Sequence, residues 1–174
     1  GNEIPIGHVG EICVRGPLLM QHYLNKPSET AEAFEGEWLH TGDLGRFDEE
    51  GFLYIVGRKK DMIVTGGFNV YPREVEDVIS ANKSVQQAVV FGVPNDHWGE
   101  AVTAAITLRP GVTESRSLSN ALLEEVKVAK GPVQTPKAIH FVDSIPLTPV
   151  GKPDKRRLSE MYAIHSKSEP AFED

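Results

Sequence analysis

The sequence predicts an α+β protein in which a β-rich piece precedes a small α+β domain. Short apolar stretches alternate with Gly- and Pro-containing turns, which is typical of strands. Two other stretches carry apolar residues at helical spacing. The charged run 58–61 (Arg-Lys-Lys-Asp) separates two apolar strands. We place a domain boundary at this run: 1–58 is the β-rich piece, 59–162 the α+β domain, and 163–174 a polar tail that is expected to fray.

In the β-rich piece, a strand is expected over 9–15, where a Gly-Pro pair ends the apolar run. Ser28 is expected to cap a short helix that reaches about Phe34, since a serine at this position accepts a hydrogen bond from a free backbone amide. Residues 44–57 are expected to form a hairpin around the polar turn 48–51 (Asp-Glu-Glu-Gly).

In the α+β domain, Pro72 is expected to begin a helix, because its fixed φ suits the first turn. Apolar residues at helical spacing continue to Ile79, and a second helix is expected over 117–129. A final short helix is expected to open at Pro153. The expected strands are 85–93, 101–108 and 138–142.

Composition excludes several function classes. The formal net charge of −7 argues against nonspecific nucleic-acid binding, which needs a basic surface. Cys13 is the only cysteine, which excludes an internal disulfide and a multi-thiolate zinc site, and which fits a reducing cytoplasm. The six histidines show no metal-ligand spacing, so no metal site is expected. No apolar run approaches the roughly 18 residues that span a bilayer.

The segment 38–43 (Trp-Leu-His-Thr-Gly-Asp) is the first candidate for chemistry. Gly42 permits a tight turn, from which the short carboxylate of Asp43 can accept hydrogen bonds from the two hydroxyls of a ribose. Taken alone, the segment is more simply interpreted as an ordinary turn capped by Asp, because such turns are common.

Two further candidates flank the domain boundary. Arg58 presents a planar fork of donors that suits a phosphate or a nucleotide hydroxyl, although a solvated basic turn is the simpler interpretation. The loop from Gly66 to Asn69, which includes Phe68, opens with two glycines. Paired glycines allow a ligand to approach the backbone closely. A bend in a strand is the alternative there.

Lys152 is the fourth candidate. It follows Gly151 in a segment held by prolines, and a lysine held in this way can be delivered as a point charge to an anion. The alternative is a solvent-facing lysine beside a helix start. The segment is not a Walker A loop, which needs a glycine and a Ser or Thr where Pro146 and Pro153 stand.

Each motif alone is weak, but their order and spacing together resemble acyl-CoA synthetases of the adenylate-forming superfamily, up to about residue 162. The segments that carry the resemblance are Gly10-Glu11-Ile12, Tyr23 to Pro27, Trp38 to Asp43, Gly57 to Glu76, and Pro146 to Lys152. The resemblance implies that 1–58 is the end of a large ATP- and acyl-binding domain and that 59–162 is the small mobile C-terminal lid. It also implies a two-step ligase that forms acyl-AMP from ATP and a carboxylic acid, most similar to fatty-acyl ligases, and then transfers the acyl group to CoA.

The same resemblance implies roles for single residues. Asp43 and Arg58 match the family's contacts to the nucleotide ribose, and Lys60 matches the hinge between the domains. The loop from Gly66 through Gly67 and Phe68 to Asn69 matches the wall of the pantetheine tunnel. Lys152 matches the lysine that enters the site for adenylation.

The family's phosphate loop, adenine-binding segment and acyl pocket have no counterpart in this chain. Mg²⁺ is expected from the resemblance, but no ligand for it is assigned here. We therefore expect the 174-residue chain to be inactive alone. The stretch 130–137 departs from the family's Tyr-Lys-x-Pro pattern, so Lys137 and its neighbours receive no assignment to the CoA nucleotide.

Two other functions stay open at this point: an adenylation domain that loads a carrier protein, and a non-catalytic module that binds a partner. If 1–58 belongs to a larger domain, its strands have lost neighbours, and unpaired strand edges favour association with a second chain. We expect the isolated chain to form a dimer or a soluble aggregate.

Overall fold

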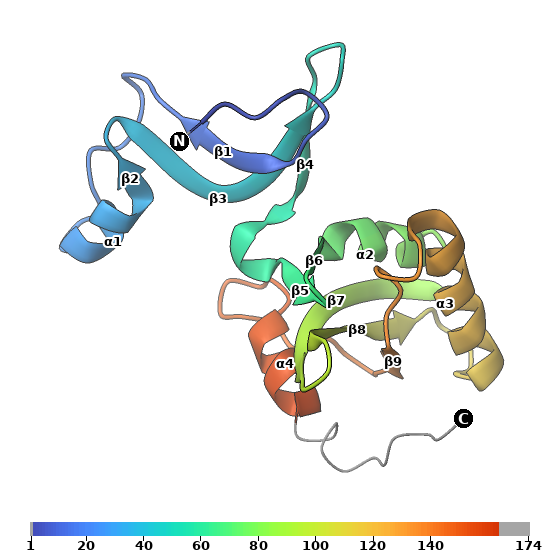
Figure 1. Cartoon of the computed structure of the whole chain (residues 1–174). Coiled ribbons are helices and arrows are strands. Elements are labelled where there is room, and N and C mark those ends of the chain that lie inside the picture. The colour runs from blue at the N-terminus through green and yellow to red at the C-terminus, as the bar shows by residue number, and fades with distance from the viewer. Residues whose placement is uncertain (1, 164–174) are drawn as a thin grey trace. The chain divides into compact units, whose positions relative to one another are not determined.

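The computed structural model describes residues 2–163 (Figure 1). The chain divides into two compact units, Gly1–Lys60 and Asp61–Asp174. The division falls inside the charged run 58–61, two residues after the boundary expected from the sequence. Residues 164–174 of the expected tail lie outside the described residues.

The first unit is an antiparallel sheet organised around one long strand, β3 (Trp38–Phe47). On one edge β3 pairs with β1 (Gly10–Val14). On its other edge it pairs with β2 (Phe34–Glu35) at its start and with β4 (Leu53–Arg58) at its end. The expected hairpin is therefore confirmed, but the expected turn at 38–43 is wrong, because these residues belong to β3.

A short helix, α1 (Pro27–Ala33), precedes β2. Its start corrects the expectation for Ser28: the helix begins at Pro27, after Lys26, and no side chain caps it. Pro27 takes the first helical position, where a missing amide proton costs no hydrogen bond. Ser28 is therefore the second residue of the helix.

The second unit is a mixed sheet in which β8 is the central strand. Its strands are β5 (Ile63–Thr65), β6 (Phe68–Val70), β7 (Val85–Asn95), β8 (Gly99–Leu108) and β9 (Ala138–Phe141). β8 pairs with β7 along its whole length and, on its other edge, with β5 at Gly99 and in parallel with β9. A 3₁₀ turn, η1 (Lys59–Asp61), leads into β5.

Helices cover both faces of this sheet (Figure 1). α2 (Pro72–Ser80) and α3 (Arg116–Lys130) pack on one face, and α4 (Lys155–Ala163) packs on the other. All three helices begin within two residues of the starts that were predicted from the sequence.

Alternate residues of β7 supply the two cores. Val90 packs with the helices α2 and α3, whereas Val89 and Phe91 pack with Leu158 of α4. Because successive side chains of a strand point to opposite faces, one strand can serve both layers.

Ser115 caps α3 by accepting a hydrogen bond from the Leu118 amide at 3.1 Å.

The first unit buries much less apolar surface. Among its described residues, the buried large apolar side chains are Leu44 and Val56, while Phe52, Tyr54 and Ile55 are more than half exposed. Within residues 2–163, no helix has the length and apolar character needed to cross a membrane.

The turn between β3 and β4 is held by one carboxylate. Asp48 Oδ1 accepts hydrogen bonds from the amides of Phe52 at 2.9 Å and Glu50 at 3.0 Å. The hydrogen bond from the Phe52 amide holds the pKa of the Asp48 carboxyl below its ordinary value of 3.8. The ionised form is therefore favoured by folding, so its contribution is complete above pH 3.8 and is lost as the pH falls through the lower, folded-state pKa.

Replacing Asp48 by Asn should lower the midpoint of thermal unfolding at neutral pH, because the amide keeps an acceptor but loses the charge. The difference from the wild type should begin to shrink below pH 3.8 and should vanish once the pH has fallen through the lower, folded-state pKa, where the wild-type side chain is neutral in the folded protein as well. Circular dichroism melts at several pH values check this. Glu49→Gln, which makes the same charge change in the same turn, should show no such pH-dependent difference.

Candidate functional site

A bulge in β3 shapes the first candidate site. Glu11 of β1 is the partner of Leu44, and Cys13 is the partner of His40. Two steps along β1 therefore correspond to four steps along β3, so that the three residues 41–43 stand opposite the single residue Ile12. Bulges of this kind redirect side chains and are common beside active sites.

The bulge leaves backbone amides without a partner in the strand ladder, and side chains accept their hydrogen bonds. The Gly42 amide donates to Glu11 Oε1 at 3.2 Å, and the Asp43 amide donates to Thr41 Oγ1 at 3.0 Å. The Thr41 hydroxyl in turn donates to the Ile12 carbonyl at 2.8 Å. Gly42 has a φ of +72°, a conformation that favours glycine.

Asp43 lies against Arg58 because the two residues are partners across β3 and β4. Arg58 Nε donates to Asp43 Oδ1 at 2.6 Å. Both side chains reach solvent, with exposed fractions of 35% for Asp43 and 46% for Arg58. An acceptor and a planar donor side by side can both hydrogen-bond to hydroxyl groups, and in such a pair one group orients the other.

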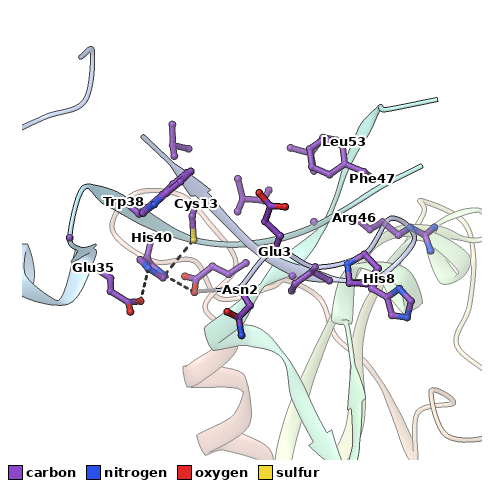
Figure 2. A pocket seen from close by; sticks show the side chains of 18 residues that line it. Asn2, Glu3, His8, Cys13, Glu35, Trp38, His40, Arg46, Phe47 and Leu53 are labelled. Carbon is purple, nitrogen blue, oxygen red and sulfur yellow. Dashed lines mark hydrogen bonds and ion pairs between the residues drawn. The ribbon is translucent and has the colours of Figure 1, made fainter. Parts of the chain in front are cut away.

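Glu11 is the centre of a hydrogen-bond network behind this pair. Its Oε2 lies 3.0 Å from His40 Nδ1 and accepts a hydrogen bond from Lys59 Nζ at 3.0 Å. Figure 2 shows His40 between Glu35, at 3.4 Å from Nε2, and the Cys13 thiol, at 3.6 Å from Nδ1. The hydrogen bond with His40, assisted by Lys59, holds the pKa of the Glu11 carboxyl below its ordinary value, whereas burial raises the pKa of the Cys13 thiol.

The cluster of Glu11, Cys13 and His40 contains atom types that can bind metals, and the three atoms lie within 4.8 Å of one another. No spacing pattern in the sequence indicates such a group, because β-sheet register brings residues 11, 13 and 40 together. Both oxygens of Glu11 are already engaged by protein donors, and Lys59 supplies a positive charge at Oε2. We therefore interpret the cluster as a network that orders β1 and β3.

The second candidate is the turn that joins β5 and β6. Gly66 and Gly67 have φ values of +56° and +82°, and Thr65 pairs with Phe68 on either side of them. Two successive positive φ values are the signature of a tight two-residue hairpin. Neither a bulge nor a simple bend accounts for the two glycines. Phe68 and Asn69 are exposed beyond the turn.

Trp98 packs behind this hairpin. The Gly66 amide donates to the Trp98 carbonyl at 2.8 Å, and a Cβ at Gly66 would lie 3.1 Å from the Trp98 ring. Lys137 places its ammonium 5.0 Å from the centre of the same ring, within the range of a cation–π contact. The backbone of Gly66 is thus fixed from the β7–β8 loop.

Lys152 lies in a closed loop before α4. Thr148 holds this loop twice: its amide donates to the Lys152 carbonyl at 2.7 Å, and its hydroxyl accepts from the Lys152 amide at 3.2 Å. Leu147 and Pro153 form a bridge across the base of the loop, and Gly151 turns it with a φ of +77°. The Lys152 side chain is exposed on a fixed backbone.

The structure brings Asp43 and Arg58 together in the first unit and places Lys152 and the Gly66–Asn69 hairpin in the second. Lys60 is exposed in η1, where the two units meet in sequence.

Residues 74–152 match the family described as the AMP-binding enzyme C-terminal domain. Over 93% of its length the chain is 53% identical to a medium/long-chain-fatty-acid–CoA ligase, FadD8, of Mycobacterium tuberculosis. The chain belongs to the adenylate-forming, AMP-binding enzyme superfamily. The resemblance drawn from the motifs is therefore confirmed.

The chain is also similar to other members of this superfamily. The chain is 45% identical over 87% of its length to a long-chain-fatty-acid–CoA ligase of Bacillus subtilis. It spans 29% of the M. tuberculosis relative and 26% of the B. subtilis relative, less than a third of either protein.

Solved structures of the superfamily share the fold. The amide bond synthetase McbA of Marinactinospora thermotolerans superposes with a TM-score of 0.85 at 40% identity, over 93% of this chain and 33% of that one. ATP-bound MatB of Rhodopseudomonas palustris superposes with a TM-score of 0.83 at 38% identity, over 94% of this chain and 32% of that one. The α+β fold of an adenylate-forming enzyme is confirmed.

Sequence reasoning did not identify Glu11, Thr41 or Trp98 as residues that shape the sites. Glu11 was seen only as part of a motif, and its partners are 31 and 48 residues away. A local signal existed for Trp98 alone, which follows a polar loop between two strands.

Gly66→Ala should destabilise the second unit more than Gly67→Ala. Both substitutions force a side chain into a left-handed conformation, which costs about 1–2 kcal/mol. Gly66→Ala also drives its Cβ against the Trp98 ring, whereas a Cβ at Gly67 would have no neighbour within 4 Å among residues 2–163. Thermal unfolding measures the two costs, and NMR of the Trp98 ring protons should shift only for Gly66→Ala. Equal losses and unchanged ring signals for both variants would contradict the packing described here.

Proposed function

We propose that this chain is the C-terminal portion of an AMP-forming acyl-CoA ligase that activates a fatty acid. In the first step, a carboxylate oxygen attacks the α-phosphorus of ATP, acyl-AMP forms and pyrophosphate leaves. In the second, the thiol sulfur of CoA attacks the acyl carbon, the thioester forms and AMP leaves. The similarity to fatty-acid–CoA ligases over nearly the whole chain carries this proposal.

Asp43 and Arg58 are proposed to bind the ribose of the nucleotide. The carboxylate accepts hydrogen bonds from hydroxyl groups, and the guanidinium both orients the carboxylate and donates to an oxygen. The contact at 2.6 Å and the exposure of both side chains support this role.

Lys152 is proposed to act in adenylation. Its ammonium would offset the negative charge that accumulates where the attacking carboxylate and the α-phosphate oxygens meet. Such a group is effective only when it is positioned in advance, and the double hold of Thr148 on the loop supplies this positioning.

The remaining assignments belong to the same proposal. Lys60 is the hinge residue, and the hairpin from Gly66 to Asn69 is a wall of the pantetheine tunnel, where backbone without side chains allows close passage. ATP and CoA are substrates, and Mg²⁺ accompanies ATP without a ligand assigned in this chain. A cytoplasmic location is part of the proposal.

Transfer to a carrier protein is the second candidate for the last step. The chain is 40% identical to a fatty acid–[acyl-carrier-protein] ligase, ScoC, of Streptomyces coeruleorubidus, over 93% of this chain and 31% of that protein. Thioester formation with CoA, compared with formation on a phosphopantetheinylated carrier protein, separates the two acceptors. Inactivity of the 174-residue chain alone, and its association into a dimer or soluble aggregate, stay predictions.

Lys152→Ala in the full-length ligase should lower the rate of ATP–pyrophosphate exchange by about 100- to 1,000-fold, the effect of removing one preorganised charge-stabilising group. Thioester formation from supplied acyl-adenylate and CoA should continue at the wild-type rate. A panel of carboxylic acids in the exchange assay with the wild type identifies the substrate.

Lys127→Ala is the matched control, because Lys127 is an exposed lysine of the same unit that pairs along its own helix with Glu124, at 3.7 Å. It should leave both half-reactions unchanged. Equal activity of Lys152→Ala and the wild type in the exchange assay would refute the role of Lys152. Absence of exchange in the wild type with every acid would refute the proposed function.

A further inference from the structure

The Asp43–Arg58 pair is bracketed by one carboxylate that is not part of it. Glu11 Oε1 accepts from the amide of Gly42, the residue before Asp43. Glu11 Oε2 accepts from Lys59, the residue after Arg58. One side chain of β1 therefore holds the chain next to both members of the pair.

Glu11 is also the most enclosed charged group of this region. Its side chain is 16% exposed, against 35% for Asp43 and 46% for Arg58. His40 contacts its Oε2 from β3 and is itself flanked by Glu35. A partly buried carboxylate with several donors is fixed in place, so it can impose its position on the more exposed neighbours.

Because of the bulge, the hydrogen bonds of Glu11 affect the direction of Asp43. Residues 41–43 have no regular ladder opposite Ile12, so the direction of Asp43 depends on the side chains that satisfy the bulged amides. Without Glu11, the Gly42 amide would lose its acceptor, and a glycine at positive φ has other conformations within reach. Displacement of reactive groups by about 1 Å is enough to cost up to 100-fold in function.

We propose that Glu11 is a positioning residue for nucleotide binding, which sets the geometry of the Asp43–Arg58 pair through Gly42 and Lys59. This inference rests on the proposed function, because it assigns a purpose to the pair that contacts the ribose. Glu11 itself does not contact the nucleotide in this scheme.

The first test uses the 174-residue chain and needs no catalysis. NMR of the Arg58 Nε–H group reports its hydrogen bond to Asp43. In Glu11→Gln this signal should shift and exchange faster with water, because an amide cannot hold Lys59 as an ion pair. Lys59→Ala removes only the hydrogen bond from Lys59 to Glu11 and leaves that from Gly42 in place. Because the Lys59 side chain is 65% exposed, this variant should shift the same signal without affecting folding.

The second test uses the full-length ligase. Glu11→Gln should raise the KM for ATP about 10- to 100-fold and leave the KM values for the acid and for CoA unchanged. The turnover rate at saturating ATP should change little, whereas a purely structural defect would lower turnover through a smaller active fraction. Glu37→Gln is the matched control: it makes the same charge change in the same unit, at a side chain that is 83% exposed and pairs with Arg15.

The outcomes are distinguishable. An unchanged Arg58 signal in both Glu11→Gln and Lys59→Ala overturns the positioning role, whatever the enzyme does. A shifted signal with an unchanged KM for ATP also overturns it, since the pair would then move without consequence for the nucleotide. A wild-type ligase that does not use ATP overturns the proposed function and the positioning role with it, and this result requires no variant.

Discussion

The need to satisfy the backbone amides of Gly42 and Asp43 governs the first unit. In a regular strand, amides that face a neighbouring strand pair with its carbonyls, but the bulge breaks the regular pairing with β1 at this point. An unsatisfied amide costs about 1–3 kcal/mol where water is excluded, so acceptors must come from side chains. Glu11 and Thr41 are those acceptors, and both connect β3 to β1. These acceptors hold the chain just before Asp43, which meets Arg58 through its pairing across β3 and β4.

In the second unit, two exposed segments are anchored to a well-packed sheet. β7 and β8 form the continuous scaffold, with cores on both faces. The Gly66–Gly67 hairpin is anchored to this scaffold through Trp98, whose loop joins the two long strands. Lys155, at the start of α4, donates to Glu76 of α2 at 2.7 Å and so fixes the chain just after the Lys152 loop. Both candidate segments are thus rigid in their backbone and exposed in their side chains.

Much of the fold could be predicted from local patterns. The helices that begin near Pro72 and Arg116 follow from helical spacing, and the turn at Asp48 follows from its residue types. Periodicity and turn chemistry act over a few residues, so a single sequence is enough to reveal them. The candidate residues were found in another way, since their order along the chain resembles a family.

What could not be predicted depends on register between distant strands. The segment before Asp43 looks like a turn because it contains Gly42, and only its pairing with β1 shows that it is a bulge within β3. The importance of Glu11 likewise appears only when Gly42 and Lys59 are placed beside it. Ser28 fails for a local reason, because Pro27 competes for the start of the same helix. Tertiary pairing, rather than propensity, decides the first two cases.

The chain contains two tryptophans, and each belongs to a different compact unit. Trp38 opens β3 beneath the Arg15 guanidinium, whereas Trp98 backs the Gly66 hairpin beneath Lys137. Intrinsic fluorescence therefore carries one reporter from each unit, and a single Trp→Phe change isolates either signal. The molecule thus has a built-in means of showing whether its sparsely packed first unit loses its structure before the well-packed second unit or together with it.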